Sequence, residues 1–235
     1  MPDDTPQAQI QQAVAFFDAQ NLFHSAKEAF GIMEPNFDPF LLAKHVCEQK
    51  NLELRQTRFY TGVPGKKEQE YWHKYWTSRL RTFRNLKIVV CDLPLRYRPK
   101  DVDLPTPGRG PQILQADGIP VTLPLLDGNG REIPKGSYLT TTTPEEKGID
   151  VRLAIDFIRL TLDKAFDVGI LFTQDQDHAE TVKEAKRIAR EQGRKLRIIS
   201  VFPAGGNNPA GVNDTEWVKL SSAEYFACLD RPRAK

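Results

Sequence analysis

Two short apolar runs in this chain lead into aspartate residues. Residues 13–17 end directly at Asp18, and residues 168–172 are followed by Asp175 and Asp177. Runs this hydrophobic predict buried strands of a parallel sheet. A carboxylate at the end of such a strand is costly to desolvate unless a neighbouring group uses its charge, and a divalent cation is the usual partner. Because the carboxyl ends of parallel strands open into one crevice, we expect these distant segments to meet there.

A further aspartate, Asp150, stands at the start of a predicted apolar helix. With Asp18, Asp175 and Asp177 it would supply oxygen ligands only, and such ligands favour Mg²⁺ or Mn²⁺, the ions of phosphodiester chemistry. Simpler roles are open as well. Asp18 is also a good strand-end turn or helix cap, Asp150 suits the positive end of its helix, and Asp177 suits a cap.

Predicted strands and helices alternate along the chain. Strands are expected at residues 13–18, 52–60, 86–91, 168–173 and 196–202. Helices are expected at residues 22–30, 38–49, 67–83, 147–166, 177–192 and 222–229, with Asn21 and Asp38 as N-caps of the first two. Residues 217–218 form only a short apolar piece. The alternation predicts a three-layer α/β fold around a mainly parallel five-stranded sheet.

The alternation is interrupted at residues 92–147, which are rich in Pro, Gly and Thr and show no helical period. Within them, residues 118–126 and 131–134 flank a strong turn sequence at 127–130, which predicts a small inserted β-hairpin. Connections between elements are usually only ~4–6 residues long, so this stretch indicates a functional segment or a subdomain. We expect it to offer a surface for a partner protein or a second copy of the chain.

Bulk composition bounds the class of protein. The 235 residues fit one domain, residues 13–235, that follows a polar lead-in at residues 1–12 and is interrupted by the insertion. Hydrophobic residues make up 40% of the chain, enough for a large core, and no apolar run is long enough for a membrane span. No secretory signal is visible and the three cysteines form no CxxC pair, so we expect a cytoplasmic protein without a zinc site. The net charge of +2 means that nucleic-acid binding must come from local basic clusters.

Three segments carry acidic motifs in a fixed order. Residues 16–22, FFDAQNL, end a strand in Asp and place Asn three residues later. Residues 147–151, KGIDV, and residues 171–177, LFTQDQD, supply the other two. In order, these segments resemble the three motifs of the NYN domain, a family of PIN-like nucleases, over roughly residues 13–91 and 146–202. The resemblance implies a PIN-like, Rossmann-like fold and a metal-dependent ribonuclease with an acidic pocket.

Two residues depart from the family pattern. Gln174 replaces the Gly that usually precedes the third-motif Asp, and His178 stands where the family tends to carry an apolar or aromatic residue. Either residue would alter the pocket or the loop without removing a carboxylate. The 92–147 insertion is also longer than the family leads us to expect.

The resemblance and the residue pattern together assign roles. Asp18, Asp150 and Asp175, with Asp177 behind them, would hold one or two Mg²⁺ or Mn²⁺ ions for hydrolysis of RNA, with single-stranded DNA as the alternative substrate. Asn21 would hydrogen-bond a ligand carboxylate, a water on the ion or a phosphate oxygen.

Substrate contacts are assigned to Thr173, Arg79, Arg84 and Arg152. Thr173 would orient a ligand or contact phosphate, although a plain strand-end threonine fits equally. The arginines would line a nucleic-acid path, although basic residues on a helix more often form a solvated face.

Other conspicuous side chains have ordinary explanations. The stripe of Trp72, Trp76, Leu80 and Phe83 predicts core packing and no base-stacking platform. Asp156 is expected in a surface ion pair with Arg152, four residues earlier. His178 is tempting as a general acid, but we expect an exposed residue at the start of a helix.

Three other functions compete with the nuclease. The first is a non-catalytic RNA- or protein-binding module that uses the insertion as its contact surface. The second is a phosphatase of the haloacid dehalogenase type, which is disfavoured because Gln20 occupies the position of its second Asp or Thr. The third, a nucleotide-binding Rossmann enzyme, is disfavoured because no GxGxxG follows the first strand.

Overall fold

The computed structural model describes residues 10–103, 114–116, 119–121 and 138–230, with side chains described for those outside 99–142. Two compact units emerge, one within Met1–Pro94 and Lys147–Lys235 and a smaller one within Leu95–Glu146. The smaller unit corresponds closely to the predicted insertion.

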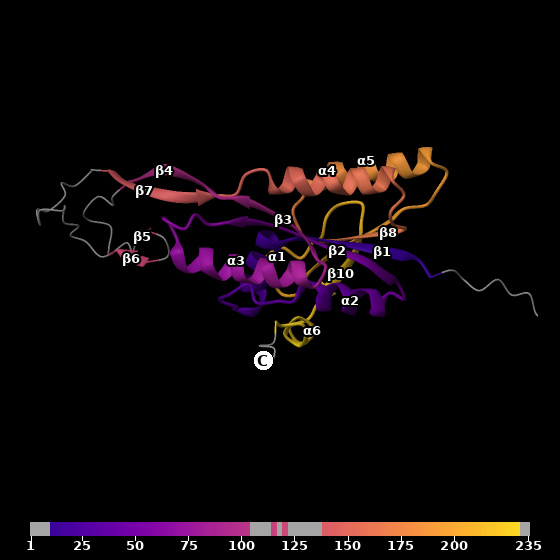
Figure 1. The fold of residues 1–235 in the computed structure, drawn as a ribbon, viewed down its shortest axis with the longest axis horizontal. Coiled ribbons are helices and arrows are strands. Elements are labelled where there is room, and N and C mark those ends of the chain that lie inside the picture. Colours follow the sequence, from indigo (N-terminus) through magenta and orange to yellow (C-terminus); the bar gives the residue numbers. More distant parts are fainter. Residues whose placement is uncertain (1–9, 104–113, 117–118, 122–137, 231–235) are drawn as a thin grey trace, which may run out of the picture. The chain divides into compact units, whose positions relative to one another are not determined.

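The larger unit is built on a six-stranded sheet in the order β10-β9-β8-β1-β2-β3 (Figure 1). The strands are β1 (Gln12–Asp18), β2 (Glu53–Val63), β3 (Val89–Pro94), β8 (Val168–Phe172), β9 (Arg197–Pro203) and β10 (Glu216–Leu220). Every neighbouring pair is parallel. The predicted α/β class is therefore confirmed, with six strands in place of the five expected.

The sixth strand, β10, was predicted only as the apolar piece at 217–218. It lies at the edge of the sheet and pairs with β9 alone. Only Val218 and Leu220 of its five residues are buried. An edge strand this short carries too few apolar residues to show the alternation that would predict it.

Helices cover both faces of the sheet (Figure 1). They are α1 (Ala19–Phe30), α2 (Pro39–Gln49), α3 (Glu70–Asn85), α4 (Ile149–Leu162), α5 (His178–Glu191) and the short α6 (Ser222–Ala227). Successive residues of a strand point to opposite faces of the sheet, so β1 contributes side chains to the hydrophobic core on each face. Ala15 and Phe17 pack with α1, α2 and α3, whereas Val14 and Phe16 pack with α4 and α5.

Two aspartates cap the helices α1 and α2. Asp18 is the N-cap of α1, and its side chain accepts the backbone N–H of Asn21 at 3.1 Å. The prediction of Asn21 as the cap was wrong, because the helix begins immediately after the strand and leaves Asp18 at the boundary. Asp38 caps α2 as predicted, and Gly31 ends α1 with a φ of 69°.

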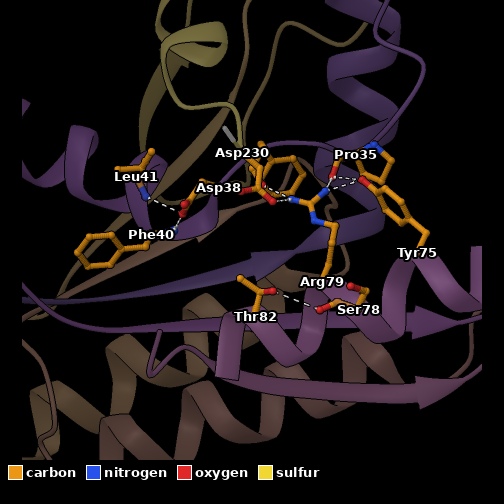
Figure 2. A network of polar contacts seen from close by, with 10 residues as sticks. Pro35, Asp38, Phe40, Leu41, Tyr75, Ser78, Arg79, Thr82 and Asp230 are labelled. Carbon is orange, nitrogen blue, oxygen red and sulfur yellow. Dashed lines mark hydrogen bonds and ion pairs between the residues drawn. The ribbon is translucent and has the colours of Figure 1, made fainter. Parts of the chain in front are cut away.

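Arg79 of α3, which the sequence assigned to substrate binding, is an internal anchor (Figure 2). Its side chain is only 10% exposed, and its guanidinium donates to the carbonyl oxygens of Pro35 and, at 2.6 Å, Phe37. It also donates to the Tyr75 hydroxyl at 2.6 Å and lies 3.7 Å from Asp230. Arg79 therefore ties α3 to the loop before α2 and to Asp230, which follows α6.

The aromatic stripe of α3 packs mainly into the core, as predicted. Leu80 and Phe83 are buried, and Trp76 packs against them and against Phe59 of β2 at a ring distance of 6.0 Å. Trp72 is only partly buried and contacts neighbouring tyrosine rings of its own helix.

The described residues of the smaller unit form two antiparallel ladders. Strand β4 (Arg96–Asp103) pairs with β7 (Tyr138–Glu145), and β5 (Leu114–Ala116) pairs with β6 (Ile119–Val121). The first arm of the predicted hairpin thus contains β6, but β6 pairs with the segment before it. The predicted turn at 127–130 and the arm at 131–134 lie outside the described residues.

Candidate metal centre

Three side chains from distant parts of the sequence converge at one end of the sheet. They are Asp18 at the end of β1, Asp150 in the first turn of α4 and His178 at the start of α5. One ligand atom from each lies within 4.8 Å of the other two. The structure thus brings Asp18 and Asp150 together, as the sequence predicted, and adds a histidine that the sequence did not assign to the site.

The topology explains this convergence. Strands β1 and β8 are parallel neighbours with Phe17 opposite Phe172, so Asp18 lies beside the start of the loop that leads to α5. Helix α4 packs on the same sheet face as α5 through the buried residues Ile149 and Leu153. Gly148, with a φ of 85°, allows the chain to turn sharply into α4. The first turn of α4 therefore starts at the carboxyl end of the sheet.

Asp18 is buried, with 4% exposure, and neutral donors hold both of its oxygens. Oδ1 accepts the N–H of Asn21 at 3.1 Å, and Oδ2 accepts the Thr173 hydroxyl at 3.2 Å. The Nε2 atom of His178 lies 4.0 Å from the same Oδ2. Thr173 thus donates to the Asp18 carboxylate, and its predicted contact with a phosphate stays a prediction.

Asp175 and Asp177 border the site without joining the group of three. The N–H of Asp175 donates to the Thr173 hydroxyl at 3.1 Å, and the N–H of Asp177 donates to Asp175 Oδ1 at 3.0 Å. Asp175 is half-buried and Asp177 is exposed. Asp177 occupies the N-cap position of α5 but makes no side-chain cap bond. Both carboxylates act on the centre through their charge.

Negative charge accumulates at this end of the sheet. The pKa of Asp150 is raised by desolvation and by the charges of Asp18, Asp175 and Asp177. Burial alone would lower the pKa of His178, but its interaction with Asp18 and the charges of Asp150 and Asp175 outweigh burial and raise it. His178 lies 4.0 Å from Asp18 Oδ2 and, when protonated, offsets part of this negative charge.

Asn21 and Gln174 shape the loop around the site. The Asn21 side-chain oxygen accepts the N–H of Gln174 at 2.9 Å, while the Gln174 amide donates to the carbonyl oxygens of Asn208 at 2.7 Å and Ala210 at 2.9 Å. Asn21 thus holds the Asp18 carboxylate through its backbone N–H, and its side chain positions the loop. The Gln174 side chain links this loop to the 205–213 segment.

Asp156 of α4 is a buried structural residue. It is 5% exposed, and it accepts from Arg58 at 2.7 Å and from the Tyr60 hydroxyl at 3.0 Å. The predicted pair with Arg152 is present at 3.5 Å, but the expected surface position is wrong. The helical spacing suggested the Arg152 partner, but only the packing of α4 on β2 brings Arg58 to the same carboxylate.

The remaining predicted substrate contacts lie on the surface. The Arg152 side chain is 54% exposed, two residues beyond Asp150 on α4. Arg84 pairs with Asp92 at 2.6 Å, and both side chains are solvent-accessible. Neither arginine belongs to the converging group.

The expectation of an exposed His178 was wrong. Its side chain is 2% exposed and packs at the buried start of α5. Two turns of amphipathic pattern follow it in the sequence, with Val182 and Ala185 on the buried face. Residue 178 lies on the same helical face as these two residues, and this spacing is the sequence signal that predicts a buried His178.

A basic surface pocket lies further along α5. It is lined by Lys183, Lys186, Arg190, Arg194, Lys195, Leu196 and Asp214. Lys183 is five residues beyond His178, about 7.5 Å along the helix axis. The loop that carries Asp214 also contacts the site loop, because the Gln176 amide donates to the carbonyl oxygen of Gly211 at 2.9 Å. The pocket and the acidic centre are therefore connected through neighbouring elements of one unit.

Comparison with known proteins identifies no family for this chain. No model of a known protein family matches the chain, and no curated protein does. A crystal structure of a protein of unknown function from Vibrio parahaemolyticus is similar over 93% of this chain and 98% of that one, with 17% identity and a TM-score of 0.47. A likeness of this degree says nothing about the activity of either chain. Among the described residues, no helix is long and apolar enough to cross a membrane.

Proposed function

We propose that this protein is a metal-dependent endonuclease that hydrolyses RNA, in keeping with the resemblance of its three motifs to the NYN domain. The observation that carries the proposal is the convergence of Asp18, Asp150 and His178 within 4.8 Å at the carboxyl end of a parallel sheet. Asp18 and Asp150 belong to separate acidic motifs that lie far apart in the sequence.

The side chains present fit a divalent cation. Two carboxylates and an imidazole are ordinary ligands for such an ion, and His178 Nε2 is a buried atom without a hydrogen-bond partner. A bound ion would supply the activation of water and the stabilisation of charge on the phosphate. Asp18 and Asp150 would hold it, Thr173 would keep Asp18 oriented, and Asp175 and Asp177 would add negative charge at the border.

RNA binding needs positive charge to offset this acidic centre. Because carboxylates repel phosphates, an acidic pocket alone binds a polyanion poorly. The basic pocket beside α5 offers that charge through Arg190 and Lys195, both of which are exposed. In this proposal the RNA runs along α5. One of its phosphates lies at the acidic centre, and the basic side chains of the pocket hold the flanking phosphates.

The direct test is cleavage of a mixed single-stranded RNA by purified protein with Mn²⁺. We expect fragments with the wild type, none after addition of a chelator, and at least a ~100-fold slower rate for Asp150→Asn, since loss of one charged ligand removes most of the stabilisation of the reacting phosphate. Glu48→Gln is the matched control, because Glu48 is an exposed carboxylate on α2 whose partner, Lys44, lies outside the pocket.

The variants must be purified identically, so that a contaminating ribonuclease shows itself by cleaving with all three proteins. Intact RNA with Mg²⁺ and with Mn²⁺ would reject the nuclease and favour a binding module. Cleavage by Asp150→Asn at the wild-type rate would remove Asp150 from the mechanism.

A further inference from the structure

His178 carries a polar atom that the protein leaves unsatisfied. The residue is 1% exposed, and its Nε2 atom is buried without a hydrogen-bond partner. The nearest carboxylate oxygen, Asp18 Oδ2, lies 4.0 Å away, too far for a hydrogen bond. Buried polar atoms almost always have a partner, so an orphan of this kind needs an explanation.

The surroundings of this atom match a ligand position. His178 belongs to the group in which Asp18, Asp150 and His178 each present one atom within 4.8 Å of the others, and its Nε2 lies 4.0 Å from Asp18 Oδ2. Ligand atoms of one ion stand about 3–4 Å apart, because each bond to the ion is about 2.1 Å long. Small side-chain rotations would close the observed spacing onto a single cation.

The ring is also held in place by its helix. His178 shares the buried face of α5 with Val182 and Ala185, which pack between the helix and the sheet. The imidazole therefore already lies beside the Asp18 carboxylate with no ion bound. Such preorganisation is what a ligand needs in order to bind without a large rearrangement.

We propose that His178 Nε2 is the third protein ligand of this centre, and that it makes the centre select a transition-metal ion such as Mn²⁺ over Mg²⁺. Mg²⁺ prefers oxygen ligands, whereas imidazole nitrogen suits the later divalent metals, and Mn²⁺ accepts both. The inference deepens the proposed function by naming the ion, but its test does not depend on RNA.

A direct readout is pulsed electron paramagnetic resonance of the Mn²⁺-loaded protein. In the wild type we expect a hyperfine coupling between Mn²⁺ and one imidazole nitrogen. This coupling should change when histidine is labelled with ¹⁵N, and it should be absent in His178→Gln. His45→Gln is the matched control, because His45 lies on α2 and pairs with Glu224 at 3.1 Å. A wild-type spectrum without nitrogen coupling would overturn the proposal, and would favour a protonated imidazole that only neutralises Asp18.

Affinity gives a second, independent readout. Titration of the metal-free protein should show Mn²⁺ binding at least ~10-fold tighter than Mg²⁺ binding. His178→Gln should lose at least ~10-fold in Mn²⁺ affinity and change little toward Mg²⁺, because glutamine offers an oxygen in place of the nitrogen. Equal affinities for the two ions, unaltered by the substitution, would contradict the selection. If the glutamine variant does not fold, the ¹⁵N experiment on the wild type still decides.

The outcomes separate this inference from the nuclease proposal. Mn²⁺ bound through His178 with RNA left intact would support the ligand and reject the nuclease. RNA cleavage that is equal with Mg²⁺ and Mn²⁺, and unchanged in His178→Gln, would support the nuclease and reject His178 as a ligand.

Discussion

Asp150 carries a charge that is unfavourable for folding but suited to binding a cation. It is exposed in the first turn of α4, where a negative charge interacts favourably with the helix dipole. Its pKa is nevertheless raised, by desolvation and by the neighbouring aspartates. A raised pKa means that the ionised carboxylate opposes folding at neutral pH, because the protonated form is the one favoured in the fold. A cation would reverse the sign of this contribution.

Neutralising Asp150 should therefore stabilise the metal-free protein and weaken its response to metal. In the presence of a chelator at pH 7, we expect Asp150→Asn to melt at a higher temperature than the wild type. With Mn²⁺ at 100 times its Kd, the wild type should gain about 2.7 kcal/mol and the variant much less. Thermal melting with and without the ion measures both effects. A variant that is less stable without metal would contradict the charge repulsion.

At the scale of elements, α4 is fastened to the sheet by two different kinds of contact. Phe157 lies against Gly169 of β8, where a Cβ atom would approach its ring to 2.6 Å. Nearby, Asp156 receives hydrogen bonds from Arg58 and Tyr60 of β2. One contact depends on shape and the other on charge, and both hold the helix whose first turn carries Asp150.

The shape contact predicts that Gly169→Ala is destabilising. The added methyl group must displace a buried aromatic ring, and overpacking of this kind costs about 1–3 kcal/mol. Gly206→Ala is the control, since the nearest atoms to its Cβ would be 3.9 Å away and nothing has to move. Urea unfolding of the two variants checks the difference. Equal stabilities would mean that α4 can shift freely on β8.

The charge contact predicts a pH-dependent loss of stability in Asp156→Asn. Burial alone would raise the pKa of Asp156, but the hydrogen bonds from Arg58 and Tyr60 and the charges of Arg58 and Arg152 outweigh it and lower the pKa. The carboxylate therefore stabilises the fold above its unfolded pKa of about 4, and this stabilisation is lost as the pH falls through the lower, folded pKa.

At pH 7, Asp156→Asn should lower the free energy of unfolding by about 3 kcal/mol, because Arg58, whose side chain is only 13% exposed, loses its counter-charge. The difference from the wild type should shrink as the pH is lowered below about 4. The control is Asp92→Asn, which removes an exposed pair with Arg84 and should change stability by about 0–1 kcal/mol. A constant difference at all pH values would rule out the ionised carboxylate as its source.

At the scale of the whole molecule, the sign of the charge changes from the acidic centre to the basic pocket along α5. Not every basic residue near this helix is available to a ligand. Arg187 is engaged by Glu184 and Glu191, and Arg194 donates to the carbonyl oxygens of Phe166 and Thr161. Arg190 and Lys195 are exposed and line the pocket.

If RNA follows this path, Arg190→Ala combined with Lys195→Ala should weaken RNA binding and flatten its salt dependence. Removing one basic side chain from a phosphate should reduce the slope of log affinity against log salt by roughly 0.7 for a single strand. Binding measured at several salt concentrations with the cleavage-defective Asp150→Asn background separates affinity from catalysis. Arg187→Ala should leave the slope unchanged, because its charge is already paired. A double variant with the wild-type slope would place the RNA elsewhere.

Much of the architecture follows from local patterns in the sequence. The apolar runs before Asp18 and Asp175 are buried strands, and the helices at 38–49 and 177–192 form within a few residues of their expected bounds. These elements were predictable because their apolar period and their end signals are local. Strand β10 was missed, because an edge strand of five residues owes its conformation to its partner, β9.

The site was predictable only in part. Asp18 and Asp150 were recognisable because charged residues at the ends of apolar elements stand out in any sequence. The burial of His178, Arg79 and Asp156 was not recognisable in the sequence. His178 and Asp156 were predicted to lie on the surface, and Arg79 was predicted to contact substrate. All three are polar side chains that are buried among elements distant in the sequence. Their burial is set by what packs against them, a property of the assembled fold that no local pattern carries.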